Sequence, residues 1–229
     1  MSQDQHPAHA LRAAPRRRVL SLPPPVYDLT QLLFFPINYA IGGLCYLQPQ
    51  TGRRSAGEPS PSVETLKQAI LSGADIAYAE QDLLRLYDTL EPVSAADDMI
   101  GHTWRGRILR TRSSVLDLAE WAIVRPLGKL GIHWGKRYRS ADKGDPLLLN
   151  WRRRLYIPVP LWGNVGMTDI RFRGVPTATM NYDHQPWKDY FKWLENQAGQ
   201  RVLLGVWTHK HIAGGWFTLT LDEQVPTPP

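Results

Sequence analysis

Apolar residues recur at helical spacing between residues 62 and 90, and this pattern predicts two successive helices. Ser62 is suited to cap the first helix, and Gly73 is suited to end it. The second helix covers residues 75–90 and is closed by Pro92. The residues on the two inward faces are Leu66, Ala69, Ile70, Leu83, Leu86 and Leu90. We expect both helices to be scaffold.

From about residue 100, short alternating runs of apolar and polar residues predict strands. A first strand is predicted over residues 104–112, and residues 133–140 form either a strand or a turn. Two hairpins follow, one joined at Gly174 and one turning through Ala213–Gly215. The four strands of these hairpins are 168–175, 176–183, 201–211 and 214–223.

Two more helices are predicted among the strands. Residues 113–128 have helical spacing, and residues 185–195 form a short amphipathic helix with Trp187, Tyr190 and Trp193 three positions apart. Many short strands with helices before and between them predict an α+β domain. Its sheet is expected to be a small, partly helical β-barrel or a curved sheet.

The first 62 residues differ from the rest in composition. Residues 1–28 are rich in Pro and Arg and are expected to form a loosely attached arm. Residues 29–48 carry no charge, but Pro36 and Asn38 interrupt them, which favours packing on the domain or a membrane surface over a membrane span. A Pro-, Gly- and Ser-rich linker ends this region, so the chain divides into residues 1–62 and a ligand-binding domain at 63–229.

Composition and charge limit the possible partners. Of the 229 residues, 43% are hydrophobic, which is enough for a core, and nine Trp and nine Tyr stand out. The net charge is +6, but the Arg clusters are separated and accompany no recognition motif, so no nucleic-acid partner is expected. Cys45 is the single cysteine; it allows no disulfide and fits a cytoplasmic location, with a weak membrane association through residues 29–48.

Four stretches resemble one known family. They are "MIGHTWRGR", "NWR", "FRGVPTATMNYDHQPWKDYFK" and "LLGVW" with "GGWFTLTL", and together they resemble the bacterial and fungal GXWXG-domain proteins. In that family a GXWXG segment is followed by a companion domain of unknown function. The resemblance covers about residues 63–222. This chain carries one extra residue between Gly101 and Trp104.

The Gly-x-Trp element is also similar to the first strand of lipocalin-type barrels, where a Trp closes one end and an arginine packs on its indole. The resemblance therefore implies a small calycin-like antiparallel β-barrel with N-terminal helices, closed at its floor by Trp104. Gly101 and Gly106 would let the backbone approach the ring. The arginine would be Arg105, Arg107 or Arg110. Such a barrel holds one small, mainly apolar ligand.

The densest polar cluster lies at residues 181–190, where a strand is expected to meet a helix. If Asp183 faces the interior, its carboxylate is a candidate acid or base in an apolar pocket. If His184 faces inwards instead, the imidazole takes that role, with Tyr182 as a donor. A third interpretation makes Asp183 the cap of a helix that starts at Pro186.

The remaining candidates lie elsewhere. Asn150 and Trp151 are expected to reach the cavity, and His209 with His211 form an i, i+2 pair that could contribute to a metal site. We nevertheless expect no metal and no cofactor, because a third ligand is not evident and no glycine-rich phosphate loop follows a strand.

These observations favour an enzyme that binds a small hydrophobic metabolite and isomerises it, cyclises it or eliminates a group from it without a cofactor. The expected catalytic residues are Asp183, His184 and Tyr182. The expected ligand-binding residues are Trp104, Asn150, Trp151, Asn181 and Lys188. Two alternatives are a non-catalytic carrier or sensor of the same ligand, and a membrane-associated accessory protein tethered by residues 29–48.

Overall fold

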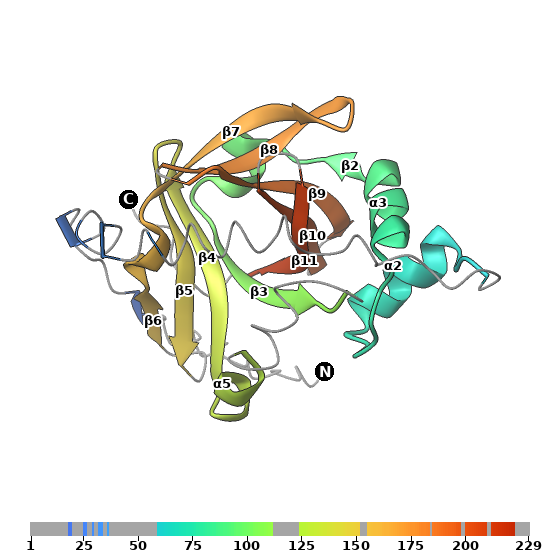
Figure 1. Cartoon of the computed structure of the whole chain (residues 1–229), viewed down its shortest axis with the longest axis horizontal. Helices are drawn as coiled ribbons and strands as arrows, with labels where there is room; N and C mark the ends of the chain where they lie inside the picture. Colours follow the sequence, from blue (N-terminus) through green and yellow to red (C-terminus); the bar gives the residue numbers. More distant parts are fainter. Residues whose placement is uncertain are drawn as a thin grey trace, which may run out of the picture.

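A strongly curved antiparallel sheet forms the body of the protein, and helices pack against its outer side (Figure 1). The computed structural model describes six stretches and a few residues near the N-terminus. These are 59–111, 124–151, 155–183, 185–197, 200–209 and 212–222, with 18–19, 25, 26, 29, 32, 33 and 36. The class is α+β, as the sequence predicts.

The described helical elements are short. They are α2 (Val63–Leu71), α3 (Glu80–Thr89), a π-helical turn η1 (Ala95–Met99), α5 (Arg125–Lys129) and a 3-10 turn η3 (Pro160–Trp162). Helix α2 begins as predicted, because the Ser62 hydroxyl accepts the N–H of Thr65 at 3.0 Å. Gly73 follows the helix with a φ of 78°, a conformation that favours glycine.

Ten strands follow one another in a single ladder. They are β1 (Arg18–Val19), β6 (Leu155–Pro158), β5 (Lys143–Trp151), β4 (Ile132–Ser140), β3 (Thr103–Leu109), β11 (Ile212–Leu221), β10 (Gln200–His209), β9 (Trp187–Gln197), β8 (Val175–Tyr182) and β7 (Val165–Phe172). All these neighbours are antiparallel except β1 and β6, and the short β2 (Glu91–Pro92) pairs with β9. Residues from the predicted N-terminal arm therefore supply an edge strand.

One end of this ladder, β7, approaches the β4–β5 turn without forming a strand pair with it among the described residues. Figure 1 shows β4 and β5 as one wall, β9 to β11 as the opposite wall, and β8 and β7 arching over them. The N–H of Met167 donates to the carbonyl of Ala141, at the β4–β5 turn, at 2.7 Å. The sheet is thus an open cup, and the predicted closed, calycin-like barrel is not confirmed.

The cup separates two apolar cores. The concave core takes side chains from the inner face of the sheet, including Trp104, Tyr138, Met180, Tyr182, Trp187, Phe191, Trp207 and Phe217. The convex core packs α2 and α3 on β9, β10 and β11, and includes Leu66, Ile70, Leu83, Leu86, Tyr190, Leu194, Leu204 and Trp216. The inward faces predicted for the two helices are confirmed at these positions.

The prediction of a helix over residues 185–195 is wrong, because most of this segment is strand β9. Each edge of β9 is hydrogen-bonded to a neighbouring strand. Asp189 and Phe191 point to the concave core, and Tyr190 points to the convex core. A strand buried on both faces shows no simple alternation of apolar and polar residues, so its tryptophans and tyrosine imitate a helical spacing.

The two predicted hairpins are present. Strands β7 and β8 are joined by Arg173 and Gly174, whose φ angles of 49° and 92° suit a two-residue hairpin turn. In the second hairpin, His209 pairs with Ile212, so residues 213–215 belong to β11 and not to the turn. The predicted strand at residues 104–112 is confirmed as β3, and residues 133–140 are strand and not turn.

Several predictions fall on residues outside the described part of the chain. They concern most of the helix at 113–128, most of the apolar segment at 29–48, and Cys45. Leu29, Leu32 and Leu33 are described and are exposed. Within the described residues, no helix combines the length and apolar character that a membrane crossing requires.

Gly106 makes room for a tryptophan, as predicted, but the ring belongs to Trp134. A Cβ atom on Gly106 would lie 2.3 Å from that indole. Trp104 is fully buried in the concave core, where it packs on Trp193 with 6.3 Å between ring centroids. Arg201 lies over Trp193 at 4.8 Å, which is the nearest equivalent to the predicted arginine contact.

The arginines predicted to cover Trp104 lie elsewhere. Arg105 and Arg107 alternate with Trp104 and Gly106 along β3 and therefore point to the convex side. The Arg107 guanidinium donates to the carbonyl of Ile70 at the end of α2.

We expect Gly106→Ala to destabilise the fold by about 1–3 kcal/mol, because the new methyl group would overlap the Trp134 ring. Gly128→Ala in α5 is the matched control, because nothing lies within 4 Å of a Cβ there. Urea unfolding followed by tryptophan fluorescence measures both. Equal stabilities for the two variants would show that Trp134 relaxes without cost.

Candidate functional site

A buried ion pair lies at the centre of the concave side. The Lys136 ammonium and the Asp189 carboxylate are 3.0 Å apart, and their side chains are only 4% and 1% exposed. Lys136 comes from β4 and Asp189 from β9, which are separated in the ladder by β3, β11 and β10. The two residues therefore meet across the interior of the cup, and only a curved sheet brings them together.

Two further groups complete the hydrogen bonding of Lys136. Its ammonium donates to the carbonyl oxygen of Pro146 at 3.1 Å and lies 3.5 Å from the hydroxyl of Tyr182. The Tyr182 hydroxyl is also 3.5 Å from Asp189 Oδ2. A lysine, a carboxylate and a phenol from three different strands thus form one polar cluster, which we call the Lys–Asp–Tyr cluster (Lys136, Asp189 and Tyr182).

Aromatic rings surround this cluster. The Lys136 nitrogen lies 5.4 Å from the ring centroid of Phe217 and 6.0 Å from that of Trp134. Trp187 packs edge-on against Tyr182, with 5.5 Å between the ring centroids. These rings exclude water and leave the ion pair in surroundings of low polarity, where each charge–charge and hydrogen-bond interaction is strengthened.

Burial changes the acid–base properties of the cluster. Desolvation raises the pKa of Asp189, although the charge of Lys136 and the hydrogen bonds from Lys136 and Tyr182 act in the opposite direction. Burial is also the main reason why the pKa values of Tyr182 and Tyr138 lie well above their usual range. The phenols therefore remain protonated at neutral pH, and Asp189 is the group suited to take up and return a proton.

One oxygen of Asp189 is available for chemistry. Oδ2 contacts Lys136 and Tyr182, whereas Oδ1 is buried and has no hydrogen-bond partner among the described residues. A buried carboxylate oxygen without a partner is costly in a folded protein, and such groups concentrate at functional sites. The arrangement suits a general base whose reactive oxygen is Oδ1.

The structure separates the predicted catalytic residues. Tyr182 lies in the interior and belongs to the Lys–Asp–Tyr cluster, while the neighbouring Asp183 is exposed. An exposed carboxylate is not in the apolar pocket that the prediction required. Asp183 does not cap a helix at Pro186 either, because strand β9 follows. His184 lies outside the described residues.

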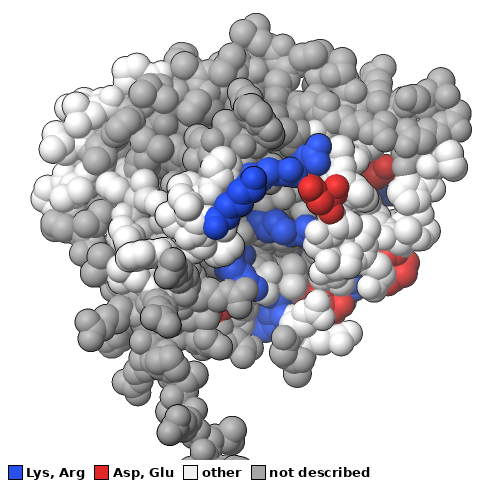
Figure 2. Space-filling view, turned by 90° about the horizontal axis from the view of Figure 1, so that it is seen from below, with Lys and Arg blue, Asp and Glu red and all other residues white. Residues whose placement is uncertain are grey.

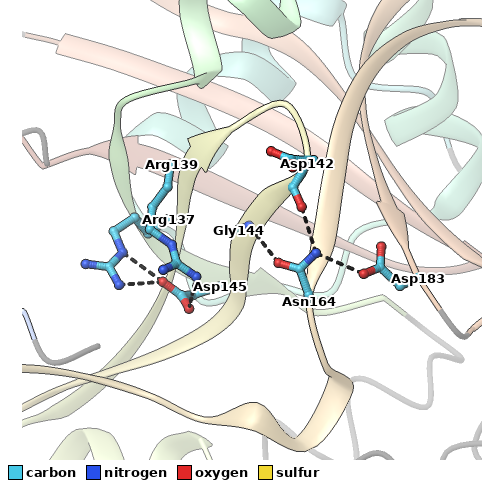
Figure 3. Close-up of polar contacts among 7 residues, drawn as sticks. All are labelled: Arg137, Arg139, Asp142, Gly144, Asp145, Asn164 and Asp183. Carbon is cyan, nitrogen blue, oxygen red and sulfur yellow. Dashed lines mark hydrogen bonds and ion pairs between the residues drawn. The ribbon is translucent and has the colours of Figure 1, made fainter. Parts of the chain in front are cut away.

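Asp183 instead belongs to a polar clamp on the rim of the cup (Figure 3). The Asn164 amide nitrogen donates to Asp183 Oδ2 at 2.9 Å and to the carbonyl of Asp142 at 2.8 Å. The amide oxygen of Asn164 accepts the N–H of Gly144 at 3.2 Å. This clamp fastens the segment before β7 to the β4–β5 turn and the end of β8, which gives Asp183 a structural role.

The predicted ligand-binding residues are also dispersed. Trp104 lies in the concave core, but Asn181 and Lys188 pair on the convex face. Trp151 is 53% exposed. Asn150 is buried on the same face as Leu148 and Tyr156, which form a small cluster separate from the concave core.

A second buried ion pair, Arg137 with Asp145, differs from the first in its surroundings. Asp145 receives Arg137 at 2.6 Å and also lies 3.5 Å from Arg139, so both carboxylate oxygens are engaged (Figure 3). Its partners are two permanently charged guanidinium groups. This pair is suited to holding β4 and β5 together and not to proton transfer.

Positive charge on the surface does not by itself define a site. Figure 2 shows Lys and Arg side chains gathered in the middle of one face, with acidic side chains close by. Among the described residues, Arg110 and Arg125 both form ion pairs with Asp75, at 3.2 and 2.8 Å, so part of the positive charge is already balanced within the protein. For the predicted histidine pair, His211 is not among the described residues, and within these no three potential ligands cluster around a metal position.

The fold and the second half of the chain are similar to known sequences and structures. Residues 163–221 match a domain of unknown function, DUF4334, which therefore covers β7 to β11. A crystal structure of a protein from Thermomonospora curvata is 24% identical, with a TM-score of 0.53, and the match covers 70% of this chain and 98% of that one. This likeness supports the fold alone. No curated protein matches the chain.

We expect Lys136→Met to destabilise the protein by about 3–5 kcal/mol, because it leaves Asp189 buried without its counter-ion. The double variant Lys136→Met with Asp189→Leu should recover most of this loss. Lys143→Met, at an exposed lysine of β5, is the control. A double variant as unstable as the single one would show that the ion pair is not the source of the effect.

The free energy of unfolding should depend on pH through Asp189, in a direction that follows from its pKa. Because the folded-state pKa of Asp189 is raised above the unfolded value of about 3.9, the folded state binds this proton more tightly. The stability contributed by Asp189 is therefore complete below the unfolded pKa and is lost as pH rises through the folded pKa. Lys136→Met should extend this loss to higher pH, measured by urea unfolding between about pH 4 and pH 8. A curve parallel to that of the parent protein would contradict this assignment.

Proposed function

We propose that the concave side of the sheet binds a small hydrophobic metabolite and that Asp189 performs cofactor-independent acid–base chemistry on it. The observation that supports this most directly is the buried Asp189 carboxylate with one unpartnered oxygen, beside Lys136 and Tyr182. Isomerisation, cyclisation and elimination are the reactions that such a group can promote with no redox partner.

Each member of the cluster has a separate role in this proposal. Asp189 Oδ1 takes the proton from the ligand and returns it. Lys136 limits the rise in the pKa of Asp189 and so favours the charged carboxylate that accepts the proton. Tyr182, whose pKa is raised by burial, stays neutral and orients the carboxylate through Oδ2. Trp104, Trp187 and Phe217 belong to the apolar surroundings.

We also propose that the chain is related to the GXWXG-domain proteins and that its sheet holds a ligand on the concave side, as a calycin barrel does in its interior. Support comes from the position of β7, which lies against the β4–β5 turn through the Met167 hydrogen bond and the Asn164 clamp. The gap between β7 and the β4–β5 turn is therefore narrow, and the concave side forms the interior of a cup. Trp104 and Trp193 form part of its apolar interior.

We expect Asp189→Asn to lower turnover by at least about a hundredfold, because it removes the base but preserves the shape of the side chain. It also removes the counter-ion of Lys136, so urea unfolding checks that it is folded, and the double variant Lys136→Met with Asp189→Asn replaces it if it is not. The assay incubates the protein with an extract of apolar metabolites and follows by mass spectrometry the loss of one compound. The product should have the same mass, or a mass lower by one eliminated group. Asp183→Asn, which alters only the rim clamp, should behave like the parent protein.

Binding without conversion would favour the carrier or sensor. In that case native mass spectrometry of the parent protein finds a bound compound, the compound leaves unchanged, and Asp189→Asn affects only its affinity. Loss of activity in Asp183→Asn together with full activity in Asp189→Asn would overturn the assignment of the base.

A further inference from the structure

Some buried polar atoms on the concave side have no hydrogen-bond partner among the described residues, and these atoms indicate which class of ligand would fit. The three N–H groups of the Lys136 ammonium have three acceptors within reach: Asp189, the Pro146 carbonyl and the Tyr182 hydroxyl. Lys136 therefore has no donor left for a ligand.

The unused donors are neutral indoles. The ring N–H groups of Trp134 and Trp187 are buried and have no hydrogen-bond partner among the described residues. Trp134 lies two positions from Lys136 on β4, and Trp187 lies two positions from Asp189 on β9, so each shares a face with one member of the ion pair. The ring of Trp187 is 5.5 Å from that of Tyr182, and Lys136 lies 6.0 Å from the ring of Trp134.

The concave side therefore presents neutral indole donors, from Trp104 as well as from Trp134 and Trp187, and the acceptor Asp189 Oδ1 among aromatic rings. These groups disfavour the binding of an anionic ligand, because the charge of Lys136 is already balanced by Asp189 and a second anion would repel the carboxylate. They also disfavour a pure hydrocarbon, which would leave all the indole N–H groups buried and unpaired. A neutral molecule with an acceptor oxygen satisfies both conditions.

We infer that the ligand class is an apolar carbonyl compound with an acidic C–H bond next to the carbonyl group. The carbonyl oxygen accepts an indole N–H from Trp187 or Trp134, and the C–H bond faces Asp189 Oδ1. This inference rests on the proposed function, to which it adds the substrate class.

The resulting step is balanced. The C–H bond breaks, its proton moves to Asp189 Oδ1, and its electron pair forms a carbon–carbon double bond while negative charge develops on the carbonyl oxygen. The indole N–H stabilises that charge because it is buried, unpartnered and held in place, so it needs no reorganisation. Asp189 then returns the proton to the same carbon, which gives exchange, or to another carbon, which moves a double bond.

Benzylacetone and butylbenzene are the matched probes, because they share an aromatic ring and a four-carbon chain and differ in the carbonyl group. We expect the protein to bind benzylacetone more tightly, and to accelerate deuterium uptake next to its carbonyl group in deuterated water. Trp187→Phe should weaken benzylacetone binding about threefold to tenfold and leave butylbenzene unchanged. Asp189→Asn, or its double variant with Lys136→Met if the single variant unfolds, should retain binding and lose the exchange.

Trp216→Phe is the control, because Trp216 also has an unpartnered buried N–H but lies in the convex core. Trp134→Phe is the second test variant if Trp187→Phe unfolds, as checked by urea unfolding. Equal affinity for the two probes, or equal effects of the Trp187 and Trp216 substitutions, would overturn the carbonyl class. If an extract compound is still converted through Asp189, the proposed function stands without that class; if none is converted, the proposed function itself fails.

Discussion

The ion pair between Lys136 and Asp189 is the interaction on which the concave side depends. Neither charge would be stable there alone, because moving one ion out of water costs several kcal/mol even after relaxation. Each residue is tolerated only while the other is in contact, and three strands separate them in the ladder. The curvature that brings β4 opposite β9 and the pairing of the two charges therefore support each other.

Close packing and the rim clamp maintain that curvature. The missing side chain of Gly106 lets Trp134 lie directly on β3, and Trp134 in turn borders Lys136. At the other end of the ladder, Asn164 connects the start of β7 to the β4–β5 turn. The site is therefore supported by backbone geometry near its centre and by side-chain hydrogen bonds at its edge, which is how a reactive carboxylate is kept in one position.

The candidate site was only partly visible in the sequence. Tyr182, a predicted site residue, lies in the Lys–Asp–Tyr cluster, and the polar stretch at residues 181–190 contains Asp189, the base that we propose. Asp189 was nevertheless passed over for Asp183, because the following segment was interpreted as a helix. Once this segment is a strand, Trp187, Asp189 and Phe191 share one face, and the carboxylate stands out as the single acid between two inward aromatic residues. The same alternation places Trp134, Lys136 and Tyr138 together on β4.

Local patterns in the sequence determined the helices α2 and α3, the strand β3 and the β7–β8 hairpin, because capping, helical spacing and a glycine turn act between near neighbours. They also established an aromatic-rich α+β chain. Only the tertiary structure decided that β9 is a strand, since burial on both faces removes the difference between the two periods. It alone decided that Lys136 meets Asp189, because that contact depends on the curvature of the whole sheet and on no local pattern.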